Sequence, residues 1–310
     1  MTATQQWSIE ELRGNPKRLR RESRVKWLAF SAAAVSVVVS SLIVYSLVFE
    51  ALGFMREVDW GTTWGQLGWF PRRNLFDLPT IIVSTLTVTA IAMVVATPLG
   101  LAAAIYLSEY ADIRARKVLK PVLEILAGIP SVVLGYFALR FIAPNVVSNL
   151  FTGAAPANLA AAGIGVGLLT IPLIASISED ALAAVPRSLR EASSGLGARK
   201  MTTTLRVVLP AALSGLTAAF IVAVSRAIGE TMVVFIAGGA ADSAIRSFNP
   251  LDPGLTMTAA MASVASGTDN VAGEGPAFQS LFFVGLLLFG MTLVLNLIAD
   301  RFVRRFRQEY

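Results

Sequence analysis

The sequence predicts an all-α, polytopic membrane protein with six transmembrane helices. Of its 310 residues, 55% are hydrophobic and only 15% are charged, whereas soluble domains carry about 25% charged residues. Six apolar runs each approach or exceed the ~20 residues that a helix needs to cross a bilayer. The runs are Leu28–Val48, Thr80–Leu107, Val118–Ile142, Leu159–Ser178, Ala211–Ala237 and Leu281–Ala299.

The N-terminal segment, residues 1–27, is polar and basic, and an apolar run follows it. A secretory signal peptide is the alternative interpretation, but both the charged segment and the apolar run are too long for one. We therefore expect a retained transmembrane helix, which with an outer loop fills residues 28–79. The tryptophans and Phe70 of that loop indicate either an interfacial aromatic belt or a contact surface for an extracytoplasmic binding protein. They are Trp60, Trp64, Trp69 and Phe70.

Residues 80–299 would hold the other five helices, with a polar loop at 179–210, and residues 300–310 form a basic tail. Pro98, Pro130 and Pro172 lie inside predicted spans, where prolines are tolerated and mark kinks. The last outer loop, Gly238–Gln279, is rich in Gly, Pro and Asp. Its apolar piece, Leu255–Val264, is too short to span a bilayer, so it predicts a re-entrant or surface helix.

Lysine and arginine are concentrated on one side of the predicted membrane. Cytoplasmic loops carry the excess of these residues, so both termini and the 179–210 loop are expected in the cytoplasm. The net charge of +6 then reflects topology rather than nucleic-acid binding. The basic side holds Arg13, Lys17, Arg18, Arg20, Arg21, Arg24, Lys26, Arg114, Arg116, Lys117, Lys120, Arg187, Arg190, Arg199, Lys200, Arg206, Arg301, Arg304, Arg305 and Arg307; the other side holds Arg56, Arg72, Arg73, Arg140 and Arg246.

Glu191–Pro210 is a polar island between two apolar spans. Pro186 can open a short helix at its first position. Gly195 and Gly197 are natural helix stops, because glycine enters the left-handed region without a Cβ clash. An amphipathic run follows the glycines. The pattern predicts a helix–turn–helix on the membrane surface, and a plain linker is the alternative.

This island resembles the EAA loop of ABC-importer permeases, whose pattern is Glu-Ala-Ala, three residues, Gly, nine residues and Ile-x-Leu-Pro. Glu191-Ala192-Ser193, Gly197 and Val207-Val208-Leu209-Pro210 match it, with Ser193 and Val207 as mild departures. In that family the loop docks into a groove of a separate ATPase subunit. The resemblance therefore implies that residues 179–210, the docking loop, bind an ATPase. The implied docking residues are Glu191, Ala192, Gly197, Leu209 and Pro210.

Two pairs of opposite charges lie within predicted spans. An arginine at the bilayer centre costs about 2.5–3.5 kcal/mol on insertion scales, so Arg226 needs a partner or a function. Glu230 lies four residues on, where the two side chains can pair on one helix face. Such a pair either locks helix packing or lines an ion path, for which a guanidinium fork suits a tetrahedral oxyanion. Lys120 and Glu124 have the same spacing and indicate an interface anchor or a second site.

Two stretches resemble the signatures of the C-type permease subunit of phosphate-specific ABC importers (the PstC/PstA family). They are L-A-G-I-P-S-V-V-L-G-Y-F-A-L at 126–139 and R-A-I-G-E-T-M-V-V at 226–234. With the docking loop, the resemblance covers about residues 80–299. It implies a type I ABC-importer permease that carries phosphate, a second related permease subunit, two ATP-binding subunits and an extracytoplasmic phosphate-binding protein. The expected translocation-path residues are Ser225, Arg226, Glu230 and Thr231.

The chain itself is not expected to be an enzyme or to hold a cofactor. It contains no histidine or cysteine, which removes thiol chemistry, His-based catalysis and nearly all zinc sites, and no Walker A pattern occurs. We expect the permease subunit of an ATP-driven phosphate importer, which works by alternating access in the inner (plasma) membrane of a bacterium. The alternatives are a permease for another oxyanion, such as sulfate or molybdate, and a membrane sensor or scaffold for phosphate signalling.

Overall fold

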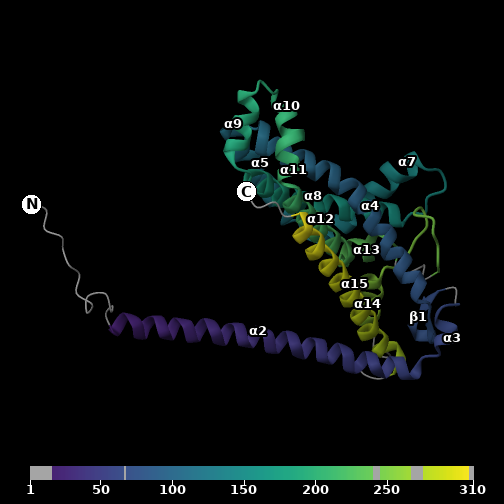
Figure 1. Cartoon of the computed structure of the whole chain (residues 1–310). Coiled ribbons are helices and arrows are strands. Elements are labelled where there is room, and N and C mark those ends of the chain that lie inside the picture. Colours follow the sequence, from purple (N-terminus) through teal and green to yellow (C-terminus); the bar gives the residue numbers. More distant parts are fainter. Residues whose placement is uncertain (1–15, 66–67, 240–244, 267–274, 307–310) are drawn as a thin grey trace, which may run out of the picture.

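The computed structural model of this chain describes residues 16–65, 68–239, 245–266 and 275–306. Within these ranges it is all-α apart from one short hairpin, as the sequence predicts (Figure 1). The first part of the basic N-terminal segment and the last residues of the basic tail lie outside the described residues.

Five described helices are long and apolar enough to cross a membrane, and a bent helix pair makes a sixth if it counts as one span. This agrees with the six predicted transmembrane helices. The five are Glu22–Glu57, Leu78–Tyr110, Ser131–Leu150, Leu159–Ala183 and Pro276–Arg301, and the pair is Lys200–Ala211 with Leu213–Ile228, bent by 71°.

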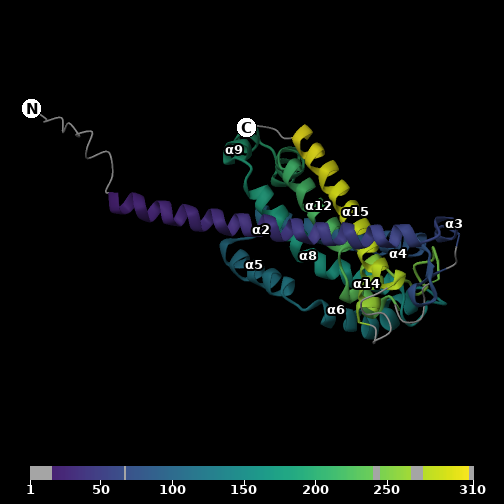
Figure 2. The same ribbon diagram turned by 90° about the horizontal axis from the view of Figure 1, so that it is seen from below.

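The first helix, α2 (Pro16–Glu57), enters the core only at its C-terminal end. There Ala51 and Phe54 are completely buried, and Phe54 stacks on Phe283 at 5.0 Å. The N-terminal part of α2 extends beyond the helical body in both ribbon views (Figures 1 and 2). The predicted span Leu28–Val48 is therefore helical, but it packs little against its own chain.

A small cap, the outer cap, follows α2 in the segment predicted to be an outer loop. It consists of α3 (Trp60–Thr63) and a hairpin of β1 (Trp69–Phe70) and β2 (Leu75–Phe76) around the 3₁₀ turn η1 (Pro71–Arg73). Trp69 is only 2% exposed and packs edge-on against Phe76. Trp69 is thus a core residue, so neither the interfacial belt nor the contact surface describes it.

Helices α4 (Leu78–Ile105) and α8 (Leu159–Ala183) form the centre of the body. Between helices in lipid, van der Waals packing replaces the hydrophobic driving force, and small residues allow close approach. Gly163 and Gly100 do this here: a Cβ at Gly163 would lie 2.7 Å from Ile91, and one at Gly100 would lie 2.8 Å from Ile174. A π-helical turn, η2 (Tyr106–Tyr110), extends α4.

The third predicted span, Val118–Ile142, is wrong in its boundaries. Helix α5 (Ile113–Ala127) is amphipathic, contains no buried residue and ends at Gly128. Pro130 disfavours a helical conformation at the residue before it, so the chain breaks there. A separate span then runs through α6 (Ser131–Phe137), the π-helical η3 (Ala138–Val147) and α7 (Ser148–Leu150). Arg140, which was counted with the cations of the opposite side near the end of the predicted span, lies in the middle of the observed span.

The docking loop forms the predicted helix–turn–helix. Helix α9 (Arg187–Gly195) is followed by a turn in which Gly197 has φ +79°, a left-handed conformation that favours glycine. The chain continues through α10 (Lys200–Thr203), the π-helical η4 (Thr204–Val208) and α11 (Leu209–Ala211). In Figure 1 the loop lies at one end of the body, and the outer cap lies at the other.

The fifth predicted span is broken. Helix α12 (Leu213–Ile228) ends at Gly229, and α13 (Met232–Ala237) begins after Thr231. In the last of the predicted outer loops, α14 (Met257–Ala265) has buried residues along its length, which favours the re-entrant interpretation of that segment over a surface helix. The last helix, α15 (Pro276–Phe306), returns to the docking-loop end.

Candidate functional site

A cavity of about 290 Å³ lies between α5, α8 and α12. Apolar side chains form most of its wall, and charged side chains project from each of the three helices. The lining residues are Leu107, Lys120, Leu123, Glu124, Ala127, Leu169, Pro172, Leu173, Ser176, Glu179 and Arg226. Arg226 lies on α12, which belongs to a candidate span, and a charge there marks a functional site by default because its cost in lipid is high.

Helices α8 and α12 run antiparallel. This direction shows which charged residues lie near the docking-loop end of the cavity and which lie deeper. A Cβ at Gly215 would lie 2.5 Å from Ala181 near the docking-loop end, and Ala223 shares a buried cluster with Ile174, two turns deeper. Arg226 follows Ala223 and is therefore near the deep end of the cavity. Glu179, four residues before the end of α8, is at the docking-loop end.

Arg226 and Glu230 are not paired. Among the described residues, no ion pair joins them, because α12 ends at Ile228 and the helical spacing of four residues is lost. Glu230 instead turns to the start of α13, where its Oε1 accepts a hydrogen bond from the Val233 amide at 3.4 Å. The predicted pairing of these two residues is therefore wrong, and only Arg226 lines the cavity.

The other two expected path residues make local contacts. Ser225 Oγ donates to Asn296 Oδ1 at 3.2 Å, which ties α12 to α15. Thr231 Oγ1 donates to the Gly229 carbonyl at 3.3 Å, across the helix break. The break is also held from α14, because Thr258 Oγ1 donates to the Glu230 carbonyl at 2.8 Å.

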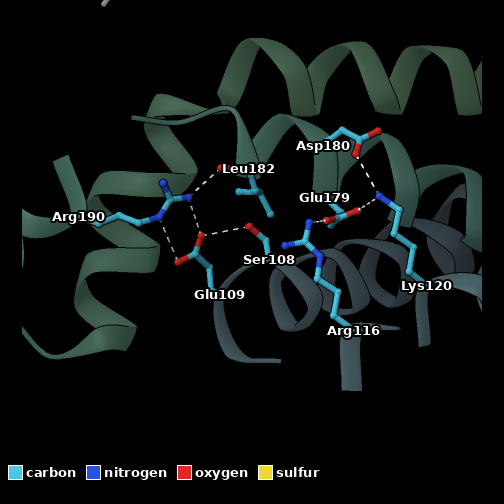
Figure 3. A network of polar contacts seen from close by, with 8 residues as sticks. All are labelled: Ser108, Glu109, Arg116, Lys120, Glu179, Asp180, Leu182 and Arg190. Carbon is cyan, nitrogen blue, oxygen red and sulfur yellow. Dashed lines mark hydrogen bonds and ion pairs between the residues drawn. The ribbon is translucent and has the colours of Figure 1, made fainter. Parts of the chain in front are cut away.

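Glu179 is completely buried and is paired with two cations of α5 (Figure 3). Arg116 donates to its Oε1, and Lys120 Nζ lies 2.7 Å from its Oε2. Lys120 also lies 3.4 Å from the exposed Asp180. The hydrogen bond with Glu179 raises the pKa of Lys120, so this ammonium is charged at neutral pH. Sequence spacing missed Glu179, because its partners are 59 and 63 positions away.

Arg190 joins the docking loop to two membrane helices (Figure 3). Its guanidinium lies 2.8 Å from Glu109 Oε1, and it donates to the carbonyls of Leu182 at 2.8 Å and Val185 at 2.6 Å. The Glu109 side chain is only 7% exposed. The Arg190 side chain thus donates hydrogen bonds to carbonyl groups at the end of α8 and neutralises a buried carboxylate of η2. These contacts hold α9 against both helices.

The exposed face of the docking loop is apolar at its tip. Leu196 is 90% exposed and Met201 is 65% exposed, and the predicted docking residues Glu191, Ala192 and Gly197 are exposed beside them. Leu209 packs instead against a buried cluster beneath the loop, so it supports the loop rather than facing outward. Sequence reasoning missed Leu196, although an apolar residue between two glycines of a polar island is a detectable signal.

Comparison with known proteins gives a consistent result. Residues 96–308 match the family described as "Binding-protein-dependent transport system inner membrane component". The probable ABC transporter permease protein YqgH of Bacillus subtilis is 33% identical, over 79% of this chain and 75% of that protein. The phosphate transport system permease protein PstC 1 of Mycobacterium bovis is 30% identical, over 91% of this chain and 92% of that protein.

Among solved structures, a bacterial ABC transporter involved in the import of the acidic polysaccharide alginate matches with a TM-score of 0.64. The match covers 94% of this chain and 100% of that chain at 13% sequence identity. At that identity the likeness concerns the fold alone, and it agrees with the permease fold that the sequence predicts.

Proposed function

Because this chain belongs to the family of binding-protein-dependent transport system inner membrane components, we propose that it is the permease subunit of an ATP-driven phosphate importer. The observation that carries the proposal is Arg226, which has no carboxylate partner among the described residues and lines the cavity between α5, α8 and α12. A guanidinium suits a tetrahedral oxyanion, because its planar fork donates two parallel hydrogen bonds. The phosphate permease relatives at about 30% identity support phosphate as that oxyanion.

The proposed complex contains a second permease subunit, two ATP-binding subunits and an extracytoplasmic phosphate-binding protein. ATP hydrolysis belongs to the ATP-binding subunits, and this chain supplies the path. It lies in the inner (plasma) membrane of a bacterium with both termini in the cytoplasm, because the positive charges gather on that side. The docking loop is then cytoplasmic, and its exposed apolar tip at Leu196 and Met201 meets an ATPase subunit.

Alternating access follows from the same elements. Closure of the ATPase subunits would move α9, and the Arg190–Glu109 ion pair would carry α4 and α8 with it. The break at Gly229–Thr231 interrupts the span beside the path, as discontinuous helices do in transporters. Ser225, Arg226, Glu230 and Thr231 remain the proposed path residues, with Arg226 in contact with the anion and the others around the break.

Transport of labelled anions tests this function. Vesicles that contain the whole complex should accumulate labelled phosphate when ATP is present and should not accumulate labelled sulfate. Uptake of sulfate or molybdate in place of phosphate would move the cargo to another oxyanion. ATP-independent phosphate signalling without uptake would favour a sensor.

Membrane orientation gives a direct prediction. A cysteine at the exposed Ser194 should react with an impermeant thiol reagent only from the cytoplasmic side, and one at Phe248, which is 75% exposed, only from outside. The native chain has no cysteine, so the unlabelled background is clean. Asp269, in the same predicted outer loop, lies outside the described residues. Equal labelling from both sides would contradict the proposed topology.

The turn of the docking loop gives a matched pair of glycine variants. Gly197→Ala should reduce phosphate uptake about five- to tenfold, because a left-handed conformation costs a non-glycine residue roughly 1–2 kcal/mol. Gly195→Ala is the control: neither glycine has a neighbour within 4 Å of an added Cβ, and only Gly197 has positive φ. Both variants should reach the membrane at normal abundance. Equal uptake by the two variants would show that the turn conformation does not matter for docking.

A further inference from the structure

We propose that the cavity between α5, α8 and α12 is an oxyanion site in which Glu124 selects a protonated anion. The inference rests on the proposed phosphate transport and adds a residue that determines specificity. Its volume of about 290 Å³ is far above the roughly 10–15 Å³ that one water needs, so a hydrated tetrahedral anion fits. Arg226 supplies the attraction, and Glu124 supplies the discrimination.

Some of the charged and polar side chains that line the cavity have no ion pair or hydrogen bond in the described part of the chain. In the described part of the chain, neither Arg226 nor Glu124 forms an ion pair, and Ser176 has no hydrogen-bond partner for its hydroxyl. Glu179, by contrast, is paired with both Arg116 and Lys120. The groups left for a ligand are therefore a guanidinium, a hydroxyl and a carboxylate.

The charged side chains of the cavity lie one after another between the docking-loop end and the deep end. Lys120 is at the docking-loop end beside Glu179. Glu124 follows one helical turn deeper on the same helix and the same cavity wall, and Arg226 is near the deep end. An anion that leaves Arg226 toward the cytoplasm passes Glu124 before it reaches Lys120.

The chemistry of the unpaired carboxylate defines the ligand. A phosphate ion near neutral pH carries at least one proton and can donate a hydrogen bond to Glu124. Sulfate carries none, so the Glu124 carboxylate repels it. The geometry thus assigns selection to Glu124 rather than Glu230, which turns to α13 and does not line the cavity.

The test applies sulfate from the cytoplasmic side, where a binding protein cannot preselect the ion. Complexes are reconstituted with the ATPase subunits outward, the binding protein and labelled phosphate are enclosed in the lumen, and ATP is added outside with sulfate. Release of labelled phosphate to the medium is measured. Sodium chloride at equal ionic strength controls for screening of the charges.

Glu124→Gln keeps the shape and hydrogen bonding of the side chain and removes its charge. The half-inhibitory sulfate concentration should fall at least tenfold relative to wild type, which corresponds to about 1.4 kcal/mol. Glu230→Gln should leave that concentration unchanged, whatever its effect on the phosphate flux itself. No change in Glu124→Gln, or an equal change in both variants, would overturn the proposal.

The unmutated complex provides a second measurement that does not depend on the folding of a variant. Arsenate is protonated like phosphate, so it should slow the release of phosphate, whereas sulfate at the same concentration should not. Equal effects of arsenate and sulfate would overturn the role of Glu124. If the wild-type complex releases no phosphate at all with ATP, the proposed function fails, and this outcome is distinct from a failure of the selection step.

Discussion

Arg226→Gln should reduce ATP-driven phosphate flux by at least about a hundredfold while the complex still assembles. The loss follows from the cavity, because Arg226 is its deep cation and no other arginine is among its lining residues. A hydrogen bond to a charged group contributes about 1.5–3 kcal/mol, a guanidinium fork makes two of them to an oxyanion, and every 1.4 kcal/mol is tenfold. Folding should be little affected, because Arg226 has no carboxylate partner among the described residues that would be left uncompensated.

The control for this variant is Arg140→Gln, which removes the same charge from another membrane span. Arg140 is exposed within η3 and does not line the cavity. Its replacement should leave phosphate flux within about twofold of wild type, since Arg140 does not line the cavity. Flux would be measured in vesicles at equal complex abundance. Normal transport by Arg226→Gln would place the anion path elsewhere and leave Arg226 a structural residue.

Arg190→Met should uncouple ATP hydrolysis from transport. The change leaves Glu109, 7% exposed, without its partner and frees two carbonyls at the end of α8. Removal of one partner of a buried pair costs roughly 3–5 kcal/mol, so α9 should separate from η2 while its exposed face still binds the ATPase. Phosphate transported per ATP hydrolysed should fall at least about fiftyfold, and ATP hydrolysis should persist.

Arg187→Met is the matched control, because Arg187 lies on the same helix α9 and is exposed. It removes the same charge without touching Glu109, so the ratio of transport to hydrolysis should stay close to wild type. A Glu109→Gln variant should resemble Arg190→Met, since it breaks the same ion pair from the other side. An unchanged ratio in both variants of the pair would show that the docking loop moves the membrane helices through other contacts.

Local patterns predicted the docking loop well. Pro186 immediately precedes α9, and Gly197 takes the left-handed conformation that its residue type favours. These features depend on single residues and their neighbours, which a sequence shows directly. The six apolar spans were also predictable, because length and hydropathy alone identify them.

The predictions of the third and fifth spans were wrong because a continuous apolar stretch of sequence was taken to be one continuous helix. Val118–Ala127 is apolar enough to extend the third span, but Gly128 and Pro130 end α5 and start a new helix. In the same way, Gly229 ends α12 and cancels the four-residue spacing between Arg226 and Glu230. The true partners of Glu109 and Glu179 come from helices 59 to 81 positions away, and no local periodicity encodes such contacts.

Most of α2 does not pack against the rest of the chain, so a small rotation at its packed end produces a large movement at its other end. Its C-terminal part packs against α15 as far back as Leu47, which faces Gly285, and about 46 Å of helix separates that point from Pro16 at 1.5 Å per residue. A rotation of about 5° at the packed end therefore displaces the basic end by about 4 Å. A small change in the packing between α2 and α15 would thus produce a much larger movement at the other end of α2.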